Sequence, residues 1–180
     1  ILLTDSLPIL ANFGLRVIEQ VSEDIELSDN EGAFIMDSFK VQAQDGDSID
    51  LVERGEDLAE ALRMVLMGTM ENDLLNRLLL RAGLKAREVD MLRAYINCAR
   101  QIEAYFPLES TRRVWVDHPE AAQLTTRLFH VKFDPDLTLP KGKDRASLLE
   151  TCHSGVKAYL GNVESNAEDR VLRTVWNLAD

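Results

Sequence analysis

The spacing of hydrophobic and polar residues changes along the chain from alternation to a helical repeat. From Leu15 to Leu27, apolar residues (Leu15, Val17, Val21, Ile25, Leu27) alternate with polar ones (Arg16, Gln20, Ser22, Asp24, Glu26), as in a half-buried strand. A turn cluster at residues 28–32 separates this run from a second strand with Ile35, Phe39, Val41 and Ala43 on one face. A short helix is predicted before them, over residues 4–13 and ended by Gly14. The pattern predicts an antiparallel sheet backed by a helix.

From Ile49 onward, apolar residues fall at helical spacing. Helical stripes are predicted around residues 58–66 and 74–82, the second ended by Gly83, and shorter helices at 109–117, 119–133, 145–160 and 166–179. The helix over residues 86–105 is apolar on most sides, so Leu92 and Ile96 are predicted core residues. Its mainly polar stripe consists of Ala86, Asp90, Arg93, Asn97 and Arg100. The fold class is therefore α+β, a small sheet followed by a mostly helical bundle.

Composition and charge narrow the classes of function. The chain has 46% hydrophobic and 28% charged residues, as globular proteins do. Its formal net charge of −11 disfavours nucleic acid and anionic membrane surfaces as partners, since both attract basic proteins. No apolar run approaches the roughly 20 residues of a membrane span. Two cysteines, Cys98 and Cys152, indicate a reducing cytoplasm rather than a disulfide scaffold.

The sequence lacks the motifs that would indicate a catalytic, cofactor or metal site. None of the nine glycines lies two positions from another, so the glycine-rich turn that binds a dinucleotide is missing, and no cofactor site is predicted. The run from Asp45 to Glu56 has Ile49 and Asp50 where a calcium loop needs an oxygen ligand and a glycine. His118, His130 and His153 lack the spacing of metal ligands. We therefore predict no catalytic, cofactor or metal residue here.

Several blocks of residues resemble the large NAD-specific glutamate dehydrogenases of bacteria. The blocks occur in the same order as in that family and lie at residues 5–10, 12–18, 133–135, 168–173 and, most informatively, 71–101. The last contains Glu71-Asn72-Asp73, Asn76-Arg77, Arg87-Glu88-Val89 and Leu92-Arg93-Ala94-Tyr95. Because those enzymes are very long, the resemblance implies that the 180 residues are a piece of a longer polypeptide.

The resemblance also implies an organisation and a role. Residues 1–48 would be a partial ACT-like regulatory module whose first strand lies upstream, 49–135 a helical domain, and 136–180 a linker and helical hairpin leading to the catalytic domain. The parent reaction would be oxidative deamination of L-glutamate to 2-oxoglutarate and ammonia with NAD. The implied partners are the remainder of the polypeptide and further copies of it in a homo-oligomer. An amino-acid effector is a candidate ligand.

Ten polar residues are the candidate interface with other domains: Glu71, Asn72, Asp73, Asn76, Arg77, Arg87, Glu88, Arg93, Asn97 and Arg100. Two interpretations of the Arg93–Arg100 row stay open. It is either a solvated face on which Asp90 pairs with Arg93, or a contact with a neighbouring domain. Two other classes of function also stay open. Residues 83–92 look like the first helix of a helix-turn-helix regulator, although a basic recognition helix does not follow. A free-standing helical adaptor is the third reading.

Overall fold

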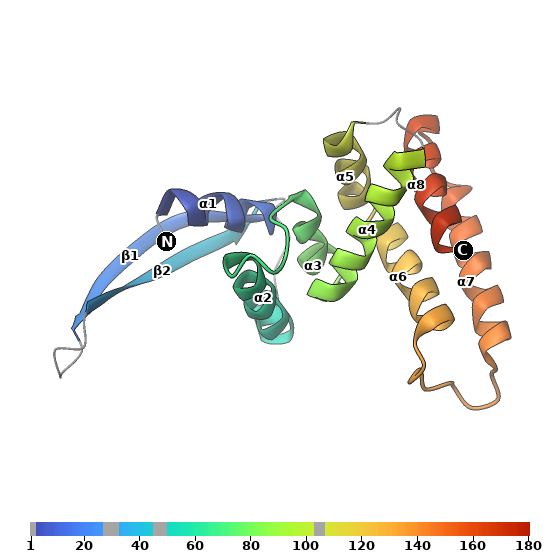
Figure 1. The fold of residues 1–180 in the computed structure, drawn as a ribbon, viewed down its shortest axis with the longest axis horizontal. Coiled ribbons are helices and arrows are strands. Elements are labelled where there is room, and N and C mark those ends of the chain that lie inside the picture. The colour runs from blue at the N-terminus through green and yellow to red at the C-terminus, as the bar shows by residue number, and fades with distance from the viewer. Residues whose placement is uncertain (1–2, 27–32, 45–49, 103–106) are drawn as a thin grey trace.

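The computed structural model describes residues 3–26, 33–44, 50–102 and 107–180. The chain forms an elongated molecule with a β-hairpin at one end and a helical bundle at the other (Figure 1). Its elements are α1 (Leu3–Asn12), β1 (Leu15–Glu26), β2 (Ala33–Ala43), α2 (Leu51–Leu66), the 3₁₀ helix η1 (Leu74–Arg77), α3 (Leu78–Arg81), α4 (Ala86–Ile102), α5 (Leu108–Asp117), α6 (Pro119–Phe133), α7 (Arg145–Leu160) and α8 (Asn166–Ala179). This order confirms the predicted α+β class.

Helix α1 and the hairpin form the first module. β1 pairs with β2 in an antiparallel two-stranded sheet, and α1 packs against β1. Gly14 joins helix to strand with a φ of 79°, a left-handed conformation that glycine adopts without strain. On either side of it, Phe13 and Leu15 are buried in the main core. The root of the hairpin is thereby anchored, while its far end projects from the body (Figure 1).

A β-bulge at Ile18 corrects the predicted face of the first strand. The register shifts between Val17, opposite Val41, and Glu19, opposite Lys40, so one residue of β1 is extra. An extra residue moves every later side chain to the other face of the sheet. Leu15 and Val17 therefore share a face with Phe39 and Val41, whereas Val21 and Ile25 lie on the opposite face, across from Ser38 and Phe34. The alternation in the sequence had predicted Leu15, Val17, Val21 and Ile25 on one face.

Capping side chains and a glycine turn determine where several of the helices begin and end. Asp50 caps α2 by accepting hydrogen bonds from the Val52 and Glu53 amides at 3.0 and 3.1 Å. The predicted stripe at 74–82 is a single turn of 3₁₀ helix followed by a short α-helix, η1 and α3. Gly83, with a φ of 63°, turns the chain into α4. Ser165 accepts the Glu168 amide at 3.4 Å to start α8.

Helix α4 lies at the centre of the bundle. Val89, Leu92 and Ile96 are fully buried, which confirms the predicted core positions. One continuous core runs from Phe13 through α2, α3, α4, α5 and α6 to Val175 of α8. A smaller cluster, around Leu128 and Cys152, joins α6 to α7. The core thus crosses position 135, where the sequence suggested a domain boundary. None of the helices in the described ranges is long and apolar enough to cross a membrane.

Candidate functional site

The segment of residues 71–77, here called the joint, lies between the hairpin module and the bundle. Asp73 caps η1 by accepting a hydrogen bond from the Leu75 amide at 3.0 Å. Asn76 fixes the start of the segment, because its side-chain amide donates to the Glu71 carbonyl at 3.0 Å. Leu75 and Asn76 are fully buried, and Asp73 nearly so. The joint is therefore a rigid, inward-folded turn whose polar residues must find partners within the protein.

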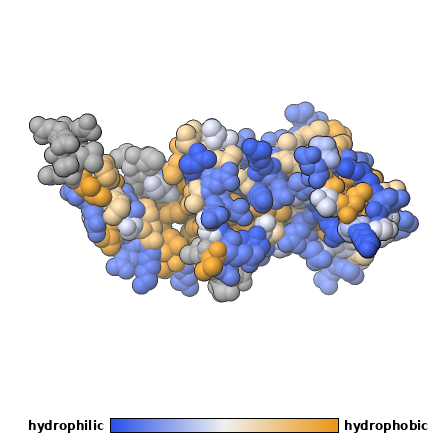
Figure 2. All heavy atoms as spheres, turned by 90° about the horizontal axis from the view of Figure 1, so that it is seen from below, coloured by the Kyte–Doolittle hydropathy of each residue, from blue (hydrophilic) through white to orange (hydrophobic). Residues whose placement is uncertain are grey.

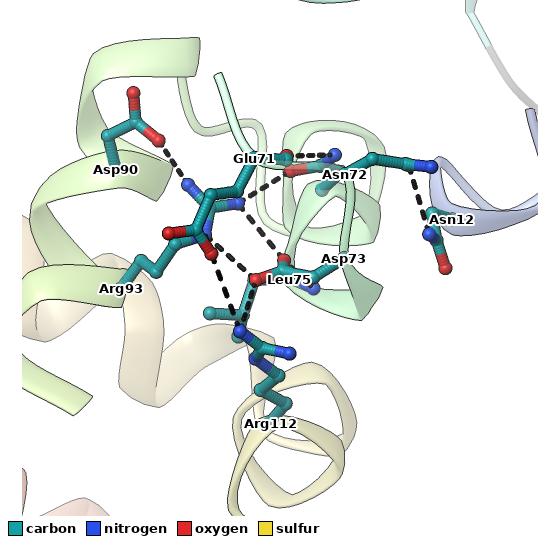
Figure 3. A network of polar contacts seen from close by, with 9 residues as sticks. Asn12, Glu71, Asn72, Asp73, Leu75, Asp90, Arg93 and Arg112 are labelled. Atoms are coloured by element: carbon teal, nitrogen blue, oxygen red, sulfur yellow. Dashed lines mark hydrogen bonds and ion pairs between the residues drawn. The ribbon is translucent and has the colours of Figure 1, made fainter. Parts of the chain in front are cut away.

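The inner side of the joint binds Arg93 of α4 (Figure 3). Arg93 donates to both carboxylate oxygens of Asp73, from Nε at 2.8 Å and from Nη2 at 3.0 Å. Nη2 also donates to Asn76 Oδ1 at 2.8 Å, and Nη1 pairs with Asp90. This forked geometry matches a guanidinium to a carboxylate. Arg93 is only 3% exposed, so the prediction of a solvent-facing Arg93 is wrong, whereas its predicted pairing with Asp90 is confirmed.

Arg112 of α5 reaches the same carboxylate from another direction (Figure 3). Its Nη2 lies 2.9 Å from Asp73 Oδ2 and 3.5 Å from Glu71 Oε2. Asp73 is therefore shared between α4 and α5, and each of its two oxygens accepts two hydrogen bonds or ion contacts. Arg112 could not be singled out from the sequence, because its position on α5 does not reveal that it faces a carboxylate 39 residues earlier.

Burial and neighbouring charges shift the pKa of Arg93 in opposite directions. Burial alone would lower the pKa of Arg93, but its hydrogen bonds to Asp73 and the charges of Asp73, Asp90 and Glu71 raise it. Arg93 thus stays charged. Burial raises the pKa of Asp90, and the nearby Arg93 opposes that shift only in part. The cluster stabilises a particular arrangement of α4, α5 and the joint, since any displacement would leave a charge buried without its partner.

The outer side of the joint contacts the hairpin module. The Asn72 side chain accepts a hydrogen bond from Asn12 at the end of α1, at 3.0 Å (Figure 3). Arg77 donates to Gln44, just after β2, at 2.8 Å and to the Ala11 carbonyl at 3.3 Å. Its side chain lies against Gly14, where an added Cβ would come 3.0 Å from Arg77 Cγ. One short segment therefore holds both halves of the molecule.

A second arginine covers the other glycine turn that the sequence singled out. Arg54 of α2 donates to the Gly83 carbonyl at 3.2 Å. A Cβ added at Gly83 would lie 2.6 Å from Arg54 Nη2. The left-handed backbone thus favours glycine at this turn, and an added Cβ would in addition displace the end of the Arg54 side chain. The sequence predicted the turn, but it gave no signal for Arg54.

The remaining predicted residues lie apart from the joint. Glu88 accepts the Lys85 amide at 2.7 Å and lies 2.7 Å from His130 Nε2, so it ties the start of α4 to α6. Arg87 and Arg100 are exposed, and Asn97 is half-buried. The structure therefore brings together six of the ten candidates (Glu71, Asn72, Asp73, Asn76, Arg77 and Arg93) and leaves four outside that cluster.

Outside the joint, a metal or a ligand would need a cluster of metal-ligating side chains or a cavity. Among the described residues, no three histidine, cysteine or acidic side chains are placed to hold a metal ion. Residues 45–49 of the rejected calcium loop lie outside the described ranges. A cavity of about 490 Å³ opens beside the bundle, between Gly83, α6 and the chain around Leu137. Its lining is mixed: apolar side chains alternate with the Glu88–His130 pair and with other polar residues, among them Arg127 and Asp134. The joint itself pairs its charges internally, which suits a structural contact rather than catalysis.

Comparisons with known proteins match two family models to different parts of the chain. Residues 1–54 match the family model of the glutamate dehydrogenase ACT3 domain, and residues 70–135, which begin at the joint, match that of glutamate dehydrogenase helical motif 3. Over 98% of its length the chain is 31% identical to the NAD-specific glutamate dehydrogenase of Halomonas elongata and 33% identical to that of Pseudomonas aeruginosa. It is 27% identical to that of Mycobacterium tuberculosis. The chain spans only 10–11% of the length of these relatives.

Proposed function

The chain belongs to the glutamate dehydrogenase family, whose ACT3 domain and helical motif 3 it contains, and on this premise we propose that it is a non-catalytic regulatory and structural segment of an NAD-specific enzyme. The parent polypeptide would oxidatively deaminate L-glutamate to 2-oxoglutarate and ammonia, with NAD as the electron acceptor. The role of this segment would be to hold the ACT3 module in a fixed position against the helical motif. It would act in the cytoplasm, whose reducing conditions suit the free cysteines Cys98 and Cys152.

The joint is the observation that supports this role. It is built from residues of the block that resembles the family, and its two sides bind different halves of the molecule. Asn72 and Arg77 bind the hairpin module, whereas Asp73 and Asn76 bind Arg93 of the bundle. A change in the position of the hairpin would have to move Asp73 against two arginines. Regulation between domains requires such a contact, one that differs in energy between two arrangements.

The rest of the chain supports the proposal that the chemistry lies elsewhere in the polypeptide. A dehydrogenase holds the pyrophosphate of its cofactor on closely approaching backbone amides, which a glycine-rich turn provides. No Gly-x-Gly occurs among these 180 residues. An amino-acid effector and a homo-oligomer remain part of the proposal for the parent. In that assembly, the predicted interface residues of α4 that could meet a neighbouring domain are the exposed Arg87 and Arg100 and the half-buried Asn97.

Calorimetry and an activity assay test the proposal together. We expect the 180-residue chain to give no heat on titration with NAD and no NADH with glutamate, while the full-length polypeptide produces NADH. In the full-length protein, Arg77→Ala should leave the catalytic reaction possible but change assembly or the response to amino acids. Micromolar NAD binding by the chain alone would contradict the proposal, as would a full-length polypeptide unable to oxidise glutamate.

The helix-turn-helix alternative has little support in the arrangement of α4 and α5. Helix α5, which would have to present basic side chains to DNA, directs Arg112 inward to Asp73. Its Trp115 and Val116 are buried in the core. A gel shift at low salt, where electrostatic attraction to phosphates is strongest, should show no specific DNA complex.

A further inference from the structure

The far half of the β-hairpin carries apolar side chains that nothing in the described structure covers. On the face created by the bulge, Val21 and Phe34 are each 48% exposed and Met36 is 43% exposed, with half-buried Ile25 between them. We call these four residues the outer patch. Figure 2 shows hydrophobic atoms beside hydrophilic ones on this projecting arm. Folded domains seldom leave several large apolar side chains together in water, because their burial is favourable.

The bulge at Ile18 separates the outer patch from the face that α1 covers. Before the bulge, Leu15 and Val17 point with Val41 toward the core. Beyond it, that same face is more polar, although it carries Phe39 and the exposed Ile35. There Gln20 and Ser22 both donate to the Asp37 carboxylate, at 2.9 and 2.6 Å. The hairpin therefore has two apolar surfaces on opposite faces, one used within the chain and one not. Bulges are a means of re-aiming side chains in this way.

A two-stranded hairpin of this length also needs external support. β1 has 12 residues and β2 has 11, and α1 packs against β1, while Val21, Phe34 and Met36 in the far half of the hairpin stay exposed. Isolated two-stranded hairpins are marginally stable in water, and three or more strands or a packed helix are normally needed. The exposure of the outer patch and the length of the hairpin therefore both favour a packing partner for the outer patch.

We infer that the outer patch packs against an apolar surface formed by another part of the same polypeptide, outside residues 1–180. This inference rests on the proposed function, because the relatives are about ten times as long as the chain and supply the additional domains. A second copy of the same patch fits less well. Glu23 lies opposite Met36 within the patch, and a symmetric contact would bring two such carboxylates together in a chain that already carries a net charge of −11. The fitting surface is apolar with a basic side chain facing Glu23.

Two adjacent residues provide a matched test, since Met36 lies in the outer patch and Ile35 on the opposite face. Ile35 is 66% exposed, more than Met36, so exposure alone would make Ile35→Lys at least as disruptive. In the full-length polypeptide, Met36→Lys should lower the thermal midpoint and loosen the hairpin to proteolysis, while Ile35→Lys should change neither. In the 180-residue chain, both substitutions should be nearly silent. Met36 should also be oxidised by peroxide several-fold more slowly in the full-length protein than in the chain.

Three results would overturn the inference. Equal peroxide oxidation of Met36 in the chain and in the full-length protein would mean that the patch stays exposed. Equal effects of the Ile35 and Met36 substitutions would mean that no particular face is used. A dimer of the 180-residue chain in sedimentation, dissociated by Met36→Lys, would identify a second copy as the occupant. Failure of the proposed function would be seen separately, as a full-length polypeptide that makes no NADH from glutamate while Met36 is still protected.

Discussion

At the scale of single residues, the buried charge of Arg93 organises the centre of the molecule. Its guanidinium contacts Asp73, Asn76 and Asp90, which come from the joint and from α4 itself. The sequence left two interpretations of its polar stripe open, a solvated face or a contact with a neighbouring domain, and neither included burial of Arg93 within the chain. The partner that makes burial possible lies 20 residues earlier, in a turn whose path the sequence pattern does not reveal.

Replacing Arg93 should therefore affect stability, whereas replacing Arg100 should not. Arg93→Ala leaves Asp73 buried with Arg112 as its remaining charged partner, and we expect a loss of about 3 kcal/mol in the free energy of unfolding. Arg100→Ala, on the exposed end of the same helix, should change it by less than about 0.5 kcal/mol. Urea denaturation followed by circular dichroism measures both. Equal effects would mean that the Asp73–Arg93 contact contributes nothing particular.

Gly83 and Gly68 separate the cost of backbone strain from that of steric overlap. Both have positive φ, 63° and 71°, but an added Cβ would meet Arg54 at Gly83 and nothing at Gly68. Gly68→Ala should cost about 1–2 kcal/mol from the left-handed conformation alone. Gly83→Ala should cost more, and Arg54→Ala should remove the excess in a double-mutant cycle. If the two glycine variants are equally stable, Arg54 gives way without cost.

At the scale of elements, the helices were largely predictable and the hairpin faces were not. Caps and breakers such as Ser165 and Gly83 mark the ends of helices in the sequence itself. Burial of Leu92 and Ile96 followed from helical periodicity. The bulge at Ile18 left no such mark, because a shift of one residue in an alternating strand depends on its pairing with β2. That single shift decides which side chains of β1 reach the core.

Helix α4 contains its own control for core burial. Ile96 is fully buried and Ile102 is 65% exposed on the same helix. Ile96→Ala should lower the free energy of unfolding by about 2–4 kcal/mol through lost burial and a cavity, and Leu92→Ala should do the same. Ile102→Ala should cost less than about 0.5 kcal/mol. A loss at Ile96 no larger than that at Ile102 would contradict the central position of α4.

The start of α7 should be sensitive to acid. Asp144 accepts the Ser147 amide at 2.8 Å, and this hydrogen bond, with the Ser147 side chain, lowers the pKa of Asp144. A carboxylate with a lowered pKa stabilises the fold above its unfolded pKa of about 3.9, and this contribution is lost as the pH falls through the folded value. Asp144→Asn keeps a capping oxygen without a titrating charge. The stability advantage of the natural chain over this variant should therefore shrink in acid, as measured by urea denaturation near neutral pH and below about pH 3. An advantage that does not change with pH would show that the charge is irrelevant to the cap.

At the scale of the whole molecule, the structure is a hairpin module and a helical bundle held by one short segment. The family and the α+β class were accessible from the sequence, because several motifs occur in the expected order and the hydrophobic period changes once. The arrangement of the joint was not, because the partners of Asn72 and Arg77 lie 60 or more residues away in α1 or 33 residues away beside β2. Contacts at such separation depend on the path of the chain rather than on any local pattern.

Hydrogen exchange in Arg93→Ala tests most directly whether the joint couples the two halves. Arg93 contacts the joint, and among the described residues its hydrogen bonds go to Asp73, Asn76 and Asp90 rather than to α1 or the hairpin. If a displaced joint also loosens the hairpin module, amides of α1 and of the hairpin root near Leu15 should lose protection from hydrogen exchange in the variant. Amides of α7 around Cys152 should keep their protection. If protection falls only in the joint and in α4, and α1 and the hairpin root exchange as before, the two halves are held independently and the account is wrong.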